Sequence, residues 1–186
     1  MTNSSSPSLS RSIRILWLLE EIGVQYEVKK YKRTAKFLAP PELKQVHCRA
    51  RAPVLQDGSH IIIESSAIVE YLISKYGSLA SSVSQKVIWS MVPSRTPFLI
   101  RPVISLELIN TIEEQLSQNE KQGKGEFLCG DHLTGSDFIV VYTFIETASF
   151  LPPLGPKTRA YAELIKARPA FQSVSATAGG AFPKVA

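Results

Sequence analysis

The most constraining feature of this chain is a pair of short apolar runs joined at an Asp-Gly dipeptide. The segment VLQDGSHIII spans residues 54–63, with Asp57 and Gly58 near its middle. Asp-Gly between apolar runs is a strong short-range signal for a hairpin, because both residues accept the positive φ that tight hairpin turns require. The sequence therefore predicts two antiparallel strands, with Pro53 at the opening of the first, a position that proline tolerates.

Helical and strand-like patterns surround this hairpin. Apolar residues between Ser12 and Ile22 recur at the helical period, and Gly23 follows them as a natural stop. The predicted order is a helix at Ser12 to Ile22, a strand at Tyr26 to Tyr31, a short helix opened by Pro40-Pro41, the hairpin, and a helix to about Lys75 with Ser65 as its N-cap. This order predicts an α/β domain over residues 1–76.

The second half of the chain is helical in pattern. Residues 77–84 are small and rich in serine, and are predicted to be a linker. Beyond it, Thr134 and Asp137 form a capping pair, and Leu133 and Phe138 occupy the positions of a hydrophobic staple. The predicted helices are Phe98 to about Gln118, kinked or restarted at Pro102, one beginning at Leu133, Lys157 to Lys166, and Pro169 to Thr177, followed by a Gly-rich tail. Residues 85–186 are thus expected to form an all-α domain.

Composition excludes several classes of protein. No run reaches the roughly 18 apolar residues of a membrane span, and the N-terminus lacks the apolar core of a signal peptide, so a cytoplasmic protein is expected, with organelle import as a less favoured alternative. Cys48 and Cys129 form neither a CxxC motif nor a metal-ligand spacing. The basic residues between Lys29 and Lys36 lie in no nucleic-acid-binding motif, and a solvated strand edge is the favoured interpretation. We therefore expect no membrane, nucleic-acid or metal partner.

Three segments together resemble a known family. They are SRSIRILWLLEEIGVQYEVKKYKR, LAPPELKQVH and APVLQDGSHIIIESSAIVEYLISKYG. Their combination is similar to the N-terminal domain of the glutathione transferase superfamily, in a branch common in fungi and proteobacteria. The likeness is close over residues 10–77 and looser over 97–105 and 126–175. It implies a thioredoxin-like α/β domain followed by an all-α domain.

The resemblance also implies a binding site for glutathione. Pro53 corresponds to a cis-proline, and the backbone of Ala52 before it would pair with the cysteinyl unit of the ligand. Glu64 would accept the ligand's ammonium group, while Ser65 and the helix start behind it would bind the α-carboxylate. Arg51 corresponds to a basic residue near the glycyl carboxylate. Taken singly, a proline opening a strand or a serine starting a helix is usually structural.

Catalysis in this family is the activation of a thiolate. The matching candidates are Ser10 and its neighbour Ser12, whose hydroxyls would stabilise the glutathione sulfur at the start of the first helix. The thiolate would attack a small electrophile, in detoxification or in secondary-metabolite biosynthesis. Reduced glutathione is then a co-substrate, no metal or bound cofactor is required, and a homodimer is left open.

Two segments depart from the family pattern. The resemblance expects an apolar strand immediately before Ser10, yet MTNSSSPSL is polar and contains Pro7. The helix after the linker, which in the family lines the electrophile pocket and the dimer interface, is shortened to about Ser84 to Met91. In addition, Cys48 stands where the family usually has another residue type. These departures keep open a second hypothesis, a catalytically impaired binding module of the same fold or the product of an altered gene.

Overall fold

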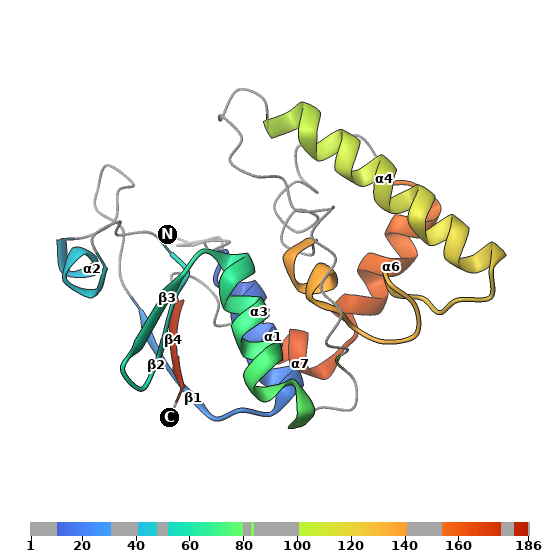
Figure 1. The fold of residues 1–186 in the computed structure, drawn as a ribbon. Helices are drawn as coiled ribbons and strands as arrows, with labels where there is room; N and C mark the ends of the chain where they lie inside the picture. The colour runs from blue at the N-terminus through green and yellow to red at the C-terminus, as the bar shows by residue number, and fades with distance from the viewer. Residues whose placement is uncertain are drawn as a thin grey trace, which may run out of the picture.

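The computed structural model describes residues 11–30, 41–47, 52–79, 83, 101–140, 154–175 and 181–185. Figure 1 shows a small sheet and its helices beside a second group of helices that includes the long α4. The elements are α1 (Ile13–Ile22), β1 (Tyr26–Lys30), α2 (Pro41–Val46), β2 (Val54–Asp57), β3 (His60–Ile63), α3 (Ser65–Tyr76), a 3-10 turn (Gly77–Leu79), α4 (Arg101–Lys121), a helical segment at residues 135–140, α6 (Pro156–Lys166), α7 (Pro169–Ser175) and β4 (Ala181–Val185). The expected α/β domain followed by helices is therefore confirmed.

The predicted hairpin is present and forms one side of the sheet. Strands β2 and β3 pair antiparallel from Val54–Ile63 to Asp57–His60. The turn between them carries Gly58 at φ 56°, a conformation that glycine adopts without a steric cost. The sheet has four strands in the order β1-β4-β2-β3, so that β3 and β1 are its edges.

The middle of the sheet is supplied from near the other end of the chain. Strand β4 pairs antiparallel with β1 along five residues and parallel with β2 at Gln56–Lys184 and Asp57–Val185. From their sequence, these residues are expected to form a tail after the last helix. A strand leading directly into α1 would instead run parallel to β1, as right-handed crossovers require. The central position is thus filled by a strand of the opposite direction.

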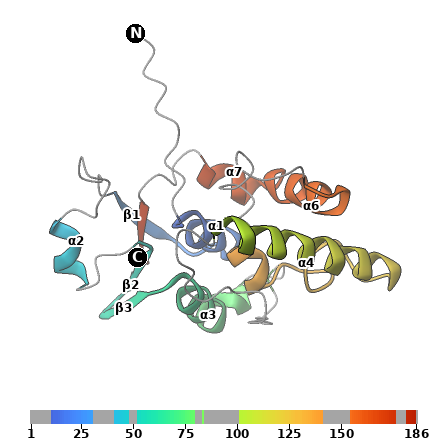
Figure 2. The same cartoon turned by 90° about the horizontal axis from the view of Figure 1, so that it is seen from above.

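Helix α1 is the centre of the hydrophobic core. It is apolar on nearly every side and lies between the sheet, α3 and α7 (Figures 1 and 2). The indole of Trp17 has no exposed surface and contacts the rings of Phe138 at 4.4 Å and Phe171 at 5.5 Å between centroids. The aromatic contacts join the α/β part to the helical part, because Trp17 belongs to the first and both phenylalanines to the second.

On the opposite face of the sheet, α2 contributes to a small separate hydrophobic cluster. Leu43 of this helix is buried against Val54, the first residue of β2, with Ala52 and Ile63 packed around them. Leu55, the next residue of β2, points instead into the core that contains α1. This alternation is the period of two expected of a strand covered on both faces.

The helical part starts at α4. Pro102 is the second residue of this helix, which agrees with the predicted restart: proline is tolerated in the first turn, where its missing N–H has no partner to lose. Residues 98–100 of the predicted helix lie outside the described residues. The carboxylate of Glu113 in α4 accepts hydrogen bonds from the backbone N–H groups of Lys157 at 3.0 Å and Thr158 at 2.7 Å, and from the Thr158 hydroxyl at 2.6 Å. Glu113 thereby caps α6 from a neighbouring helix.

The predicted capping pair is confirmed for Asp137, which caps back to Thr134, whereas the Thr134 hydroxyl donates to the Asp137 carboxylate instead of capping the backbone N–H of Asp137. Oδ2 of Asp137 accepts from the backbone N–H and the hydroxyl of Thr134, both at 2.8 Å, while the N–H of Asp137 donates to the Thr134 carbonyl. Oδ1 of Asp137 accepts from the N–H of Leu128 at 3.1 Å and from the hydroxyl of Tyr161 at 2.8 Å. Burial nevertheless raises the pKa of Asp137 above its usual value, since this carboxyl group has no exposed surface.

Two findings bear on the predicted domains and partners. The predicted boundary at residues 77–84 stays a prediction, but β4 lies in the sheet although it belongs to the range assigned to the helical domain. Within the described ranges, no helix is both long enough and apolar enough to span a membrane.

Candidate functional site

The residues that flank the hairpin lie at one end of the sheet. Val54 pairs with Ile63, so the residues immediately outside this pair, Pro53 and Glu64, leave the hairpin together at its open end. Ser65 begins α3 directly after Glu64. Four of the predicted site residues are therefore neighbours in the fold: Ala52, Pro53, Glu64 and Ser65.

The start of α1 belongs to the same end of the sheet. Because β4 is antiparallel to β1 and parallel to β2, β1 runs in the same direction as β3. Strand β3 ends where α3 begins, whereas β1 starts where α1 has just ended. Helix α1 consequently begins at the end of the sheet where α3 begins, and Figure 1 shows the two helices running side by side. The N-termini of α1 and α3 and the first residue of β2 thus lie at the same end of the sheet.

Glu64 has an unusual backbone conformation. Its φ of 72° makes it the only described residue other than glycine with a positive φ. Such a conformation costs roughly 1–3 kcal/mol and persists only where the surroundings impose it, often at ligand sites. Glu64 is also exposed, occupies the N-cap position of α3, and makes no capping hydrogen bond with its side chain.

Ser65 differs slightly from its predicted role. It is the first helical residue of α3, and the N-cap expected of it is taken by Glu64. The backbone N–H of Ser65 and of the following residue lie in the first turn, where helical N–H groups have no partner within the helix. Ser65 is half-buried. A helix start of this kind presents donors and a positive dipole end to an anion.

The peptide bond between Ala52 and Pro53 is cis, as the resemblance implies. Pro53 is buried and Ala52 half-buried against the Leu43 cluster of α2. Ala52 therefore lies at the open end of the hairpin, and its side chain is too small to cover its own backbone groups.

The remaining predicted site residues are placed as follows. Ser10 and Arg51 lie outside the described residues, as does Cys48. Ser12 is described, has no exposed surface, and provides the first carbonyl of α1, which accepts from the N–H groups of Ile15 and Leu16 at 3.0 Å. Of the two candidate catalytic serines, only Ser12 is described, and the catalytic role of Ser10 stays a prediction.

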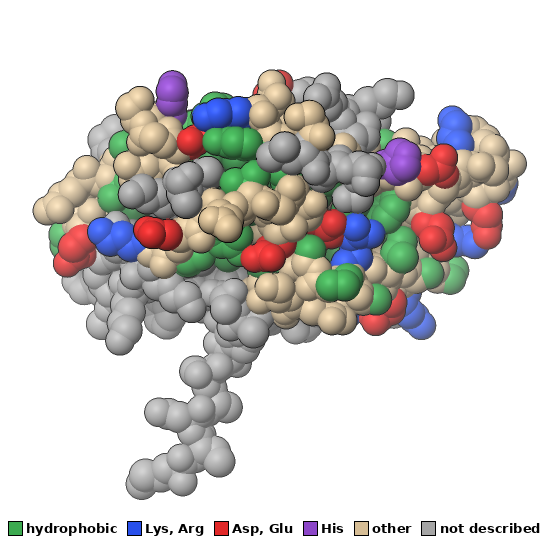
Figure 3. All heavy atoms as spheres, turned by 90° about the horizontal axis from the view of Figure 1, so that it is seen from below, with side chains coloured by type: hydrophobic (Ala, Val, Ile, Leu, Met, Phe, Trp, Pro, Cys, Tyr) green, Lys and Arg blue, Asp and Glu red, His purple; other side chains and the backbone are tan. Residues whose placement is uncertain are grey.

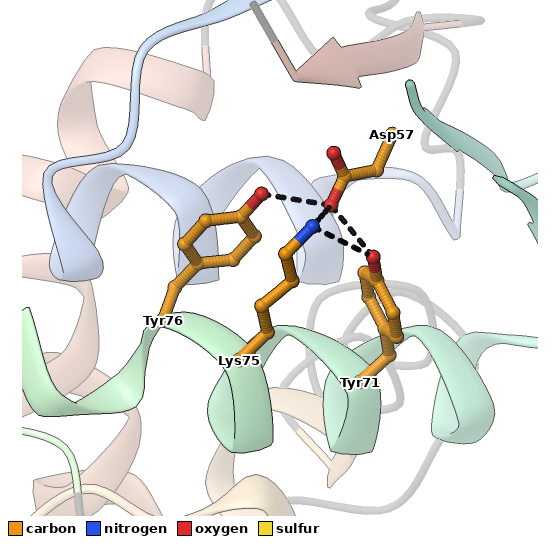
Figure 4. A network of polar contacts seen from close by, with 4 residues as sticks. All are labelled: Asp57, Tyr71, Lys75 and Tyr76. Atoms are coloured by element: carbon orange, nitrogen blue, oxygen red, sulfur yellow. Dashed lines mark hydrogen bonds and ion pairs between the residues drawn. The ribbon is translucent and has the colours of Figure 1, made fainter. Parts of the chain in front are cut away.

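The turn end of the hairpin is fixed by a polar cluster that sequence reasoning missed. Oδ2 of Asp57 accepts from the hydroxyls of Tyr71 at 2.7 Å and Tyr76 at 2.8 Å and from Nζ of Lys75 at 2.8 Å (Figure 4). Burial alone would raise the pKa of Asp57, but these donors outweigh it and hold that pKa below its usual value. The available signal was the run Tyr-x-x-x-Lys-Tyr on the helix that follows an Asp-Gly turn.

Other polar groups lie away from this edge. A hollow of about 500 Å³ at the junction of α1 and α7 is lined by Glu20, Glu21, Arg168 and residues 169, 170 and 173. Glu21 there is engaged by Arg168 through two contacts of 2.6 and 2.8 Å and by the Trp17 indole N–H at 2.9 Å. These interactions tie α1 to α7, and the hollow is remote from the hairpin's open end.

The structure also bears on metal and nucleic-acid binding. Among the described residues, no group of three or more His, Cys, Asp or Glu side chains is arranged to hold a metal ion. Lys29 is exposed on β1, and most of the basic run after it lies outside the described residues. On the face drawn in Figure 3, acidic and basic side chains are interspersed.

Comparisons with known proteins agree with this geometry. Residues 5–74 match the family described as "Glutathione S-transferase, N-terminal domain". The chain is 28% identical over 163 residues to "Glutathione S-transferase 1" of Saccharomyces cerevisiae, covering 70% of this chain and 69% of the relative. It is 44% identical over 68 residues to "Glutathione S-transferase 3" of Schizosaccharomyces pombe, covering 37% of this chain and 28% of the relative.

Solved structures show the same fold. A glutathione transferase homolog from Lodderomyces elongisporus, crystallised with two GSH per subunit, superposes with a TM-score of 0.70 at 18% identity, covering 89% of this chain and 93% of that one. A glutathione transferase from Phanerochaete chrysosporium in complex with oxidized glutathione superposes with a TM-score of 0.68 at 21% identity, covering 91% and 92%. The likeness therefore extends over both halves of the chain.

Proposed function

Because this chain belongs to the glutathione S-transferase superfamily, we propose that it binds reduced glutathione at the open end of the hairpin and transfers it to a small electrophile. The observation that carries the proposal is the conformation of Glu64, an exposed residue held at positive φ directly beside the start of α3. The backbone of Glu64 is strained and its carboxylate is exposed, so this carboxylate can bind an ammonium group. The N–H groups in the first turn of α3, beside it, can bind a carboxylate. The α-amino acid end of glutathione carries both groups.

The family resemblance supplies the roles that we propose for the other residues. Ala52 offers backbone groups to the cysteinyl unit at the mouth of the hairpin, Ser65 and the start of α3 bind the α-carboxylate, and Arg51 is assigned to the glycyl carboxylate. Ser10 is assigned to the sulfur, where a hydroxyl near the start of α1 would lower the thiol pKa. A detoxifying or biosynthetic role, a cytoplasmic location and a homodimer are further parts of the proposal.

A thermal-shift titration with reduced glutathione tests binding. A ligand with a Kd of about 0.1 mM adds about 2.7 kcal/mol at about 10 mM, which raises the midpoint by about 5–10 °C for a chain of this size. We expect this rise in the wild type and in Glu70→Ala and Ser74→Ala, two exposed positions of the same helix. We expect it to be lost in Glu64→Ala and reduced in Ser65→Ala. No rise in the wild type would refute the proposal.

A second measurement tests the catalytic role. The pH dependence of conjugation to an activated aryl halide reports the pKa of the bound thiol. We expect Ser10→Ala to move that pKa up toward the value of a free thiol, about 8.5, while Ser8→Ala leaves it in place. Equal profiles for the two variants would exclude Ser10 as the group that stabilises the thiolate.

Two observations favour the second candidate function, a binding module without transferase activity. The central strand of the sheet runs opposite to the strand that would lead into α1, and Ser12 is enclosed. A chain that binds glutathione in the titration but conjugates no electrophile would be such a module.

A further inference from the structure

We propose that strand β4 (Ala181–Val185) is a positioning element of the glutathione site, so that ligand affinity depends on backbone pairing contributed from more than a hundred residues away. The inference rests on the proposed function. From the sequence pattern, β4 is expected to be part of a tail. It also lies outside residues 5–74, where the chain matches the family.

The strand order of the sheet supports the proposal. Strands β1 and β2 are not neighbours, because β4 lies between them and pairs with both. In the described part of the chain, β4 is the only strand that joins β1, with α1 before it, to the hairpin that carries Ala52 and Pro53. A hairpin of two strands is marginal by itself, and three or more strands are needed for independent stability. The spacing between the start of α1 and the open end of the hairpin therefore depends on β4 as well as on the packing of α1 against α3.

The register between β4 and β2 also supports the proposal. The pairs Gln56–Lys184 and Asp57–Val185 fix β4 to the turn end of β2. Asp57 is also the residue that holds the hairpin to α3 through Tyr71, Lys75 and Tyr76 (Figure 4). One residue thus connects β4 and α3, the helix whose start carries Glu64 and Ser65. Loss of the β4 pairing would leave β2 and α3 held to each other, but would remove the link through the sheet between this pair and β1.

Pro183 limits the length over which β4 pairs with β2. Proline has no N–H to donate to a ladder and is rare in central strands. The pairing of β4 with β2 begins only at Lys184, directly after this proline. The central strand is consequently attached to the hairpin by a short ladder, which makes single backbone donors in β4 important.

The test compares backbone and side-chain changes at one position. Lys184 is paired on both sides, with Glu27 and with Gln56, so its N–H points to one of the two neighbours. Lys184→Pro removes that donor, whereas Lys184→Ala keeps it. We expect Lys184→Pro to lower the thermal midpoint by about 5 °C and to weaken glutathione binding about tenfold, measured by calorimetry well below the midpoint. Lys184→Ala should resemble the wild type in both measurements.

A destabilised control separates positioning from stability. Asp137→Asn lowers the midpoint through the capping pair in the helical part, away from the sheet, and should leave the Kd for glutathione unchanged at low temperature. If Lys184→Pro, folded at low temperature, binds glutathione as tightly as Asp137→Asn does, β4 is only structural and the inference is wrong.

A second variant tests the proposal by stabilising β4 instead of weakening its pairing. Pro183→Val restores an N–H and introduces a residue that favours strands. We expect its midpoint to rise by about 2–4 °C and its glutathione Kd to fall. Equal midpoints for Pro183→Val and the wild type, together with equal midpoints for the two Lys184 variants, would overturn the inference while wild-type binding of glutathione stands. Failure of the wild type to bind would instead refute the proposed function, and the positioning role with it.

Discussion

The starts of two helices in this chain are built in opposite ways. At residues 134–137 a buried side chain closes the helix start, because the carboxylate of Asp137 receives four donors. At α3 the N-cap is Glu64, which is exposed, has a φ of 72° and makes no capping hydrogen bond with its side chain. Capping residues of the Ser, Thr, Asp and Asn type stabilise a helix by about 1 kcal/mol, and α3 forgoes that gain.

The contrast indicates where a ligand is expected. A closed helix start has no donor left to offer, so its residues serve the fold. An open start with a strained residue retains both its N–H groups and its positive dipole end. Helix α6 belongs with the closed kind, since Glu113 reaches its first turn from α4. The following three predictions examine the two kinds of helix start, from the largest expected effect to the smallest.

The largest effect is expected at the closed start. Asp137→Ala leaves the N–H groups of Leu128 and Thr134 and the hydroxyl of Tyr161 buried without their acceptor. Removing one partner of such a network costs about 3–5 kcal/mol, which lowers the midpoint by roughly 6–20 °C. Urea unfolding monitored by circular dichroism measures the change.

The control for this prediction is Asp131→Ala, because Asp131 is exposed near the same helix start. That variant should change the free energy of unfolding by less than about 0.5 kcal/mol. If the two variants lost equal stability, the four contacts of Asp137 would not be what closes this helix start.

A smaller effect is expected at α6, and it should depend on pH. Burial alone would raise the pKa of Glu113, but the hydrogen bonds from Thr158 and Lys157 outweigh it and lower that pKa from 4.5. The folded state then binds this proton less readily than the unfolded state, so the stabilisation is present above about pH 4.5 and is lost as the pH falls through the lowered pKa. Glu113→Gln should cost about 1–2 kcal/mol at pH 7 and much less at pH 3.

Unfolding by urea at the two pH values checks this. The wild type and Glu113→Gln should converge in free energy of unfolding as the pH falls. Glu114→Gln, a change at the exposed neighbouring position, should show no such convergence. A difference that stays constant between pH 7 and pH 3 would mean that the ionised form of Glu113 does not cap α6.

Local signals allowed much of the fold to be predicted from the sequence. The hairpin turn at Gly58, the period of α1 and the Thr134–Asp137 pair each depend on residues within a few positions of one another, and the structure contains all three. The turn itself lies one residue later than predicted, because Asp57 pairs with His60 as the last residue of β2. The place of β4 was not predictable in this way. Its five residues include Pro183 and follow a glycine-rich stretch, and nothing in their own pattern specifies a central strand.

The same distinction applies to the candidate site. Ala52, Pro53, Glu64 and Ser65 were brought together by the resemblance and by the hairpin between them. The Asp57 cluster was missed because its three donors come from a helix 14 to 19 residues away, a pairing that depends on how α3 packs. The positive φ of Glu64 was also missed, because glutamate has no preference for that conformation.

The smallest expected effect concerns the open start, and it has the opposite sign. Glu64→Gly should relieve the backbone strain and raise the free energy of unfolding by about 1 kcal/mol, since glycine accepts a φ of 72° without a steric cost. The same change removes the carboxylate, so the glutathione-dependent rise in midpoint should disappear. Glu64→Gln is the matched control, because it keeps the strained backbone and a side chain of equal size while removing the charge. It should unfold like the wild type without glutathione and gain no stability from the ligand. A Glu64→Gly variant that gained stability and still responded to glutathione would show that the open start of α3 is not where the ligand's ammonium group binds.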